Sequence, residues 1–277
     1  MHRLISLLTV GMLAASPLLA QHAGHGAPAA SAADSTAAPT AAPIAAGQPP
    51  HLAQGWVPPV EDRMKFNYVL IDRLEFSSGD APDALILDAE GWYGGDRNKF
   101  WWKAEGSKQL SGPSSGEAEV QALYSRLVAP FWDLQAGVRY DRTWGSGPDR
   151  DRSFLVLGFE GLAPYWFELE PAVFVSEDGD VSAQLTATYD VLLTQRLILQ
   201  PRLDLNAAAQ DVPEFGVGSG LNNVELGLRL RYEIRREFAP YIGLNWIRQI
   251  GDTADLARAS GDPVDDLRFV LGLRLWW

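Results

Sequence analysis

The sequence predicts an all-β protein: an antiparallel transmembrane β-barrel of about 12 strands, preceded by a disordered N-terminal tail. Apolar and polar residues alternate from residue 66 onward, at the period with which strand side chains change faces. Short and long connections also alternate along the chain. After residue 20, no apolar stretch reaches the ~18 residues that a helical membrane span requires.

The first 63 residues differ from the rest. Residues 1–20 resemble a secretory signal peptide, with Arg3 before an apolar stretch and residues 16–20 (SPLLA) as a cleavage end. A single anchoring helix is the alternative, although Pro17 interrupts it. Residues 21–63 are rich in Ala and Pro, so they bury too little surface to offset their ordering entropy. They predict a flexible periplasmic tail before a barrel over residues 64–277.

The strands follow in order, each with one apolar parity. The last shows this most clearly, because Phe269, Leu271 and Leu273 alternate with Arg268, Gly272 and Arg274. The predicted strands are 66–76, 84–94, 98–107, 116–129, 131–143, 152–162, 164–176, 180–191, 194–207, 220–234, 237–249 and 266–277.

The connections between these strands indicate a membrane barrel. The predicted short turns lie near 95–97, 130, 163, 192 and 235. The predicted longer loops are 77–83, 108–115, 144–151, 208–219 and 250–265, with 177–179 as a short exception. Outer-membrane barrels combine tight periplasmic turns with longer external loops in this way.

A soluble barrel would bury the apolar parity, whereas a membrane barrel turns it toward lipid. Three features favour the membrane barrel. The polar parity carries many charges of both signs, and the chain stops on an aromatic residue at the end of an alternating strand. Tryptophans also gather near the short turns, as in an interfacial girdle: Trp92, Trp101, Trp102, Trp132, Trp166, Trp276 and Trp277.

The alternation is imperfect at a few positions. Asp72 shares the face of Tyr68, Leu70, Leu74 and Phe76, and Arg126 shares that of Val120 and Tyr124. Each predicts a bulge or a place near the membrane interface. Three prolines lie inside strands, where they remove a ladder donor, and we expect bulges beside them: Pro171, Pro201 and Pro240.

The polar parity places many carboxylates in the predicted lumen: Asp88, Glu90, Glu105, Asp133, Asp141, Glu160, Glu168, Glu170, Asp190, Asp204, Glu225 and Glu233. The expected counter-ions are Arg73, Arg139, Arg196, Arg202, Arg229, Arg231, Arg268 and Arg274. A ladder of ion pairs filling a narrow lumen is the simpler interpretation. The alternative is an oxygen-rich cation site formed by Asp88 and Glu90 on one strand and Glu168 and Glu170 on another.

Composition excludes several functions. The net charge of −12, from 23 basic and 35 acidic residues, argues against a protein that coats nucleic acid. The chain has no cysteine, and its histidines all precede the barrel, so a Ser-His-Asp enzyme cannot form there. We expect no enzyme and no organic cofactor. The glycine-rich residues 216–220 lack the strand–turn–helix context of a phosphate-binding loop and predict a flexible external loop.

The most metal-like local motif is His22-Ala23-Gly24-His25, beside the N-terminus that cleavage after Ala20 would create. Imidazole and amine nitrogens suit Cu(II), with zinc and nickel next. Two histidines in a tail of small residues can equally bind nothing, and the motif alone leaves both interpretations open.

Several runs resemble the copper resistance protein B family of bacterial outer-membrane proteins. They are residues 218–223 (GSGLNN), 225–234 (ELGLRLRYEI), 236–243 (REFAPYIG), 72–75 (DRLE) and 91–98 (GWYGGDRN), followed by Trp102, Glu105 and Gly106. The resemblance covers about residues 64–277. It implies an outer-membrane barrel, surrounded by lipid, that binds copper or helps to move it, alongside a periplasmic copper oxidase and copper chaperones.

The tail departs from that family. Many members carry repeated Met and His clusters there, whereas this chain retains only His22, His25, His51 and Met64. We therefore favour Cu(II) over Cu(I) as the ion, because Cu(I) prefers sulfur ligands. A structural barrel, or a general pore for small solutes with no metal role, is the alternative function.

Overall fold

The structure is a computed structural model that describes residues 64–112, 114–145 and 148–277. The predicted signal peptide (1–20) and tail (21–63) lie outside the described residues, and so do His22, His25 and His51. Among the residues described, no helix is long and apolar enough to cross a membrane.

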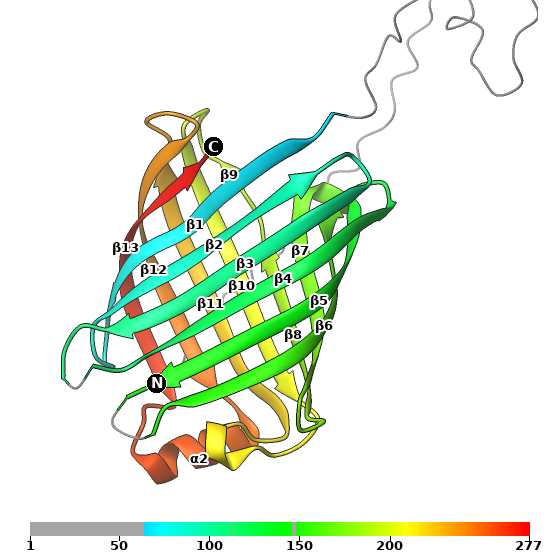
Figure 1. The fold of residues 1–277 in the computed structure, drawn as a ribbon. Helices are drawn as coiled ribbons and strands as arrows, with labels where there is room; N and C mark the ends of the chain where they lie inside the picture. Colours follow the sequence, from blue (N-terminus) through cyan, green and yellow to red (C-terminus); the bar gives the residue numbers. More distant parts are fainter. Residues whose placement is uncertain (1–63, 113, 146–147) are drawn as a thin grey trace, which may run out of the picture. The chain divides into compact units, whose positions relative to one another are not determined.

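One antiparallel sheet contains every labelled strand (Figure 1). Its strands are β1 (Phe66–Ser78), β2 (Ala84–Gly94), β3 (Asn98–Gln109), β4 (Gly116–Ala129), β5 (Trp132–Trp144), β6 (Arg150–Ala163), β7 (Phe167–Ser176), β8 (Val181–Thr188), β9 (Val191–Leu192), β10 (Leu197–Ala208), β11 (Gly220–Tyr232), β12 (Phe238–Gln249) and β13 (Asp265–Trp276). These bounds agree closely with the alternating segments of the sequence.

The sheet closes on itself. In Figure 1 the first strand, β1 (cyan), lies beside the last, β13 (red), and the two pair from Leu70↔Trp276 to Ser78↔Phe269. β8 and the two-residue β9 both pair with β10, so together they occupy one position in the wall. Counted in this way, the wall has 12 positions, which confirms the predicted number of strands.

The two ends of the barrel differ, as the connections predict. Tight turns join β2 to β3 and β4 to β5, and the 3-10 turn Pro164–Trp166 joins β6 to β7. The opposite end carries longer loops. One of them, predicted as a longer loop over 250–265, contains the helix α2 (Gly251–Ser260), which lies at this end in Figure 1.

The apolar parity faces outward and the polar parity faces the lumen. On β13, Phe269 and Leu271 are half exposed, whereas Arg268 is buried and Val270 is fully buried. Other strands show the same arrangement, with exposed Leu155 and Leu157 alternating with buried Arg152, Phe154 and Val156 on β6. Because this pattern leaves a continuous apolar exterior and an enclosed charged interior, it confirms the transmembrane barrel.

A β-bulge in β1 explains the position of Asp72. The register of β1 shifts between Ile71 and Arg73 against β2, and between Ile71 and Leu74 against β13. Before the bulge the even-numbered residues face inward, so Leu70 is buried in the lumen and not on the lipid face as the simple alternation predicts. After the bulge, the odd-numbered residues face inward, and Arg73, Glu75 and Ser77 are buried. Asp72 itself also faces the lumen.

The predicted bulges beside prolines are not present. Pro201 and Pro240 pair with Leu228 and Leu273 in continuous register. Pro171 pairs normally with Leu185 on β8, but the β6–β7 ladder has a gap between Gly158↔Ala172 and Gly161↔Leu169. The missing N–H of proline is therefore accommodated without an inserted residue. Arg126 lies opposite Asn98 near the short-turn end, where it is exposed.

The predicted tryptophan girdle is only partly correct. Trp166 and Trp277 are 72% and 59% exposed. Trp101 is 7% exposed, and its indole N–H donates to Glu90, a lumen residue, at 3.1 Å. Its ring contacts Trp92, which contacts Tyr68 in turn, and Tyr68 contacts Trp276. Trp101 shares the inward face of Lys103 and Glu105 on β3, and Trp92 shares that of Asp88 and Glu90 on β2, so the alternation itself indicates that these two indoles line the interior.

Candidate functional site

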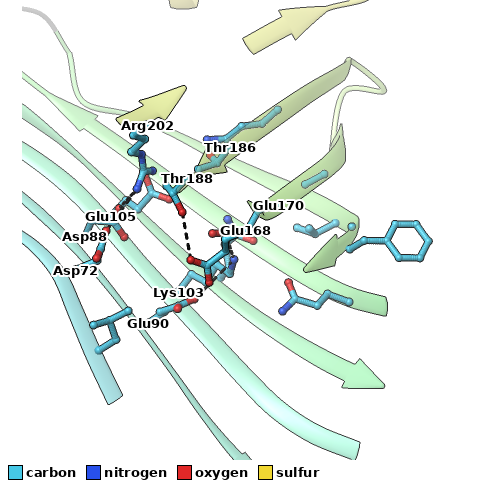
Figure 2. Close-up of a pocket in the computed structure, with 18 of the residues that line it drawn as sticks. Asp72, Asp88, Glu90, Lys103, Glu105, Glu168, Glu170, Thr186, Thr188 and Arg202 are labelled. Carbon is cyan, nitrogen blue, oxygen red and sulfur yellow. Dashed lines mark hydrogen bonds and ion pairs between the residues drawn. The ribbon is translucent and has the colours of Figure 1, made fainter. Parts of the chain in front are cut away.

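The lumen contains a small polar cavity of about 70 Å³ near its middle (Figure 2). Its charged lining consists of six carboxylates and three cations: Asp72, Asp88, Glu90, Glu105, Glu168 and Glu170, with Lys103, Arg202 and Arg274. The cavity lining therefore carries a surplus of negative formal charge. A field of this sign attracts cations and repels anions.

One group of carboxylates surrounds Lys103, on β3. Its ammonium lies 2.9 Å from Glu160 on β6 and 3.8 Å from Glu90 on β2, and it also donates a short hydrogen bond to Glu170 on β7. Oxygens of Glu90, Glu160 and Glu170 all lie within 4.8 Å of one another. We call these three residues the carboxylate triad. Lys103 thus links β3 to strands that are not its neighbours in the sheet.

A second group surrounds two arginines. Arg73 on β1 donates to Asp88 at 3.0 Å and lies 3.6 Å from Glu225. Arg202, on β10, lies 3.4 Å from Asp88 and 3.6 Å from Asp72, and it donates to Asp204 at 2.7 Å. Arg202 therefore reaches from β10 to β1 and β2.

The two groups are joined through β2. Asp88 and Glu90 are two residues apart on this strand and face the lumen together, one toward the arginines and one toward Lys103. Figure 2 shows the labelled carboxylates converging on the same cavity from different strands. The result is a row of carboxylate oxygens and fixed cations across the lumen.

The four carboxylates predicted as a cation site all line this cavity. Glu90 and Glu170 meet at Lys103, Asp88 belongs to the arginine group, and Glu168 accepts a hydrogen bond from Thr188 at 3.2 Å. Met64 is 50% exposed and does not line the cavity. Whether any of these residues binds a metal stays a prediction.

The prediction overlooked Lys103 as a counter-ion. Its inward parity on β3 was the available signal, because Trp101 and Glu105 share that face. The expected counter-ion Arg196 instead lies exposed in the short connection before β10. The other seven expected arginines all form ion pairs with carboxylates.

One side of the lumen is apolar, which the sequence did not predict. Trp101, Leu123, Phe154, Val156 and Phe174 pack together inside the wall. The guanidinium of Arg139 lies 4.6 Å from the ring centre of Phe174 and 5.2 Å from that of Phe154. This cluster occupies interior volume, so the polar cavity is confined to the remaining part of the lumen.

The lumen groups define a class of protein: a transmembrane β-barrel with a narrow, acidic interior crossed by ion pairs. Comparison of sequences assigns it further. The family described as copper resistance protein B precursor matches residues 65–277. The chain belongs to the copper resistance protein B family, which associates it with copper resistance.

Two relatives show the same assignment. Copper resistance protein B of Escherichia coli is 45% identical over 215 residues, which are 76% of this chain and 70% of the relative. The copper resistance protein B homolog of Pseudomonas syringae pv. tomato is 40% identical over 218 residues, which are 79% of this chain and 72% of the relative.

Solved structures give weaker similarities. The NanC porin aligns with a TM-score of 0.49 at 12% identity, covering 76% of this chain and 99% of the porin. Outer membrane phospholipase A of Escherichia coli aligns with a TM-score of 0.46 at 13% identity, covering 76% of this chain and 91% of the phospholipase. Neither similarity is high enough to carry a functional conclusion.

Proposed function

We propose that this protein contributes to copper resistance in the bacterial outer membrane by binding copper ions and assisting their sequestration or passage through the barrel. Copper is the cargo in this proposal, and the protein does not act as an enzyme. The observation that carries the proposal is the row of carboxylates across the lumen of a barrel in this family.

The available ligands favour Cu(II). Residues 65–277 contain no histidine, cysteine or methionine, so their side-chain ligands are mainly carboxylate, amide and hydroxyl oxygens. Such oxygens suit Cu(II) better than Cu(I), which prefers sulfur. Weak oxygen ligands at several neighbouring positions also suit passage, because an ion must leave each position as well as enter it.

The second part of the proposal concerns copper binding by the N-terminal tail. His22, His25 and His51 would act as a weak collecting arm for Cu(II) on the periplasmic side. A periplasmic copper oxidase and copper chaperones would exchange copper with this arm.

Copper flux into liposomes containing the full-length protein tests the barrel part of the proposal. We expect Cu(II) to enter faster than into empty liposomes. Glu168→Gln should lower the flux, because it removes a negative charge whose carboxylate is hydrogen-bonded only to Thr188 among the described side chains. Glu237→Gln, in an exposed turn outside the lumen, is the matched control.

Titration with Cu(II) tests the tail part. A variant with alanine at positions 22, 25 and 51 should lose part of the binding but keep the barrel flux. If neither protein binds copper and no copper enters the liposomes, the general-solute or structural barrel is the correct function.

A further inference from the structure

Lys103 is a buried cation in the lining of the polar cavity. Its side chain is 12% exposed, and its ammonium is surrounded by the carboxylate triad. Glu90 lies directly opposite it in the β2–β3 ladder, whereas Glu160 and Glu170 come from β6 and β7. The ammonium thus occupies the position where a cation would contact all three carboxylates.

The other cations that line the cavity are held differently. Arg202 contacts three carboxylates with a planar guanidinium, and the Nε of Arg274 donates to Asp72 at 2.8 Å. A guanidinium is a rigid fork of five donors, whereas an ammonium is a point charge on a flexible stem. Among the described residues that line the cavity, Lys103 is the one cation whose charge is carried by an ammonium. Lys103 therefore holds its three partners through a single charge on a flexible stem, without the fixed geometry of a guanidinium.

Displacement would leave three carboxylate oxygens near one point. Since the oxygens lie within 4.8 Å of one another, an ion at their centre would lie no more than about 2.8 Å from each, so a small inward movement of the side chains would bring all three to metal–oxygen distances. The adjoining cavity gives the lysine stem space to withdraw. A monovalent cation has no Coulombic advantage over the ammonium already present, whereas a divalent cation is attracted twice as strongly.

We propose that Lys103 is the residue that makes the path selective for divalent cations, because its ammonium holds the carboxylate triad until a divalent cation displaces it. This inference rests on the proposed function, since it concerns the path that copper would take. It adds that monovalent cations are excluded by an internal competitor and not by pore size alone.

The test compares Cu(II) and K⁺ fluxes in liposomes containing the full-length protein. Lys103→Met removes the competitor, so K⁺ flux should rise by about tenfold or more, as expected when a unit charge is removed a few ångströms from the path. Lys103→Arg should lower both fluxes, because the guanidinium would bind the triad with several donors. Lys99→Met is the matched control, because Lys99 forms a separate 2.8 Å pair with Asp133.

The two fluxes separate this inference from the proposed function. If wild type passes no copper but Lys103→Met raises K⁺ flux, the proposed function fails while the role of Lys103 is supported. Unchanged K⁺ flux in a folded Lys103→Met protein would overturn the inference, whether or not the protein passes Cu(II). Combining Lys103→Met with Glu160→Gln lowers the uncompensated charge, so it provides a second variant if the single one does not fold.

Discussion

Glu75 shows how strongly a single lumen residue can be enclosed. Its side chain is fully buried, accepts hydrogen bonds from Arg229 at 2.9 and 3.1 Å, and accepts another from the Tyr241 hydroxyl at 3.1 Å. Arg229 is only 3% exposed, so the pair is shielded from water. Pairs of this kind are costly to break, because removal of one partner leaves the other charge uncompensated.

Glu75→Gln should therefore destabilise the barrel by about 3–5 kcal/mol. Equilibrium unfolding in detergent micelles measures the change in the free energy of unfolding. The double variant Glu75→Leu with Arg229→Met should recover part of that loss, because neither charge is then left alone. A loss below 1 kcal/mol in the single variant would show that water reaches this pair.

At the scale of elements, the bulge in β1 decides which charges enter the lumen. Without the register shift after Ile71, Asp72 and Arg73 would lie on opposite faces. With it, both face inward: Arg73 pairs with Asp88, and Asp72 pairs with Arg202. A one-residue change in register reverses every following side chain, so this bulge also places Glu75 inside.

The helix α2 is held at the long-loop end by the loop before β11. The Thr253 hydroxyl accepts hydrogen bonds from the Gly218 N–H at 2.9 Å and the Asn222 side-chain amide at 2.7 Å. Asp252 accepts another from Ser219 at 3.2 Å. These contacts explain why the predicted loop 250–265 forms a helix: the neighbouring loop supplies partners that a local sequence window does not contain.

Thr253→Val should loosen this helix without unfolding the barrel. The substitution leaves two buried donors without their acceptor, at a local cost of about 1–3 kcal/mol for each. Hydrogen exchange measured by mass spectrometry should become faster in peptides covering 209–219 and 251–260. Asp255→Asn, which removes an exposed pair with Arg258, is the control and should leave exchange unchanged. Equal exchange in both variants would contradict the docking role of Thr253.

For the whole molecule, the outward apolar surface predicts where charge is tolerated. Leu157, at the middle of β6, is 56% exposed, and Tyr232, at the end of β11, is 48% exposed. Leu157→Arg should cost about 2–4 kcal/mol in a bilayer, whereas Tyr232→Arg near the interface should cost about 0–1 kcal/mol. Unfolding from lipid vesicles measures both. Similar costs at the two sites would contradict the proposed position of the membrane.

The candidate site was predictable only in part. Asp88, Glu90, Glu168 and Glu170 were recognised because alternation reveals which residues share a face. Alternation does not reveal which strands face one another across a closed barrel. Glu90 is the partner of Lys103 in the neighbouring strand, whereas the approach of Glu160 and Glu170 to Lys103 depends on the curvature of the wall and was therefore not predicted.

The sequence alone determined the strands, their number and the face that meets lipid, because these follow from a period of two and from local turn lengths. It also determined the family. The tertiary structure decided the β1 bulge, the helix α2 and the contacts of Lys103 with Glu160 and Glu170. Each of these depends on groups distant in the chain, which only closure of the barrel brings within a few ångströms of one another.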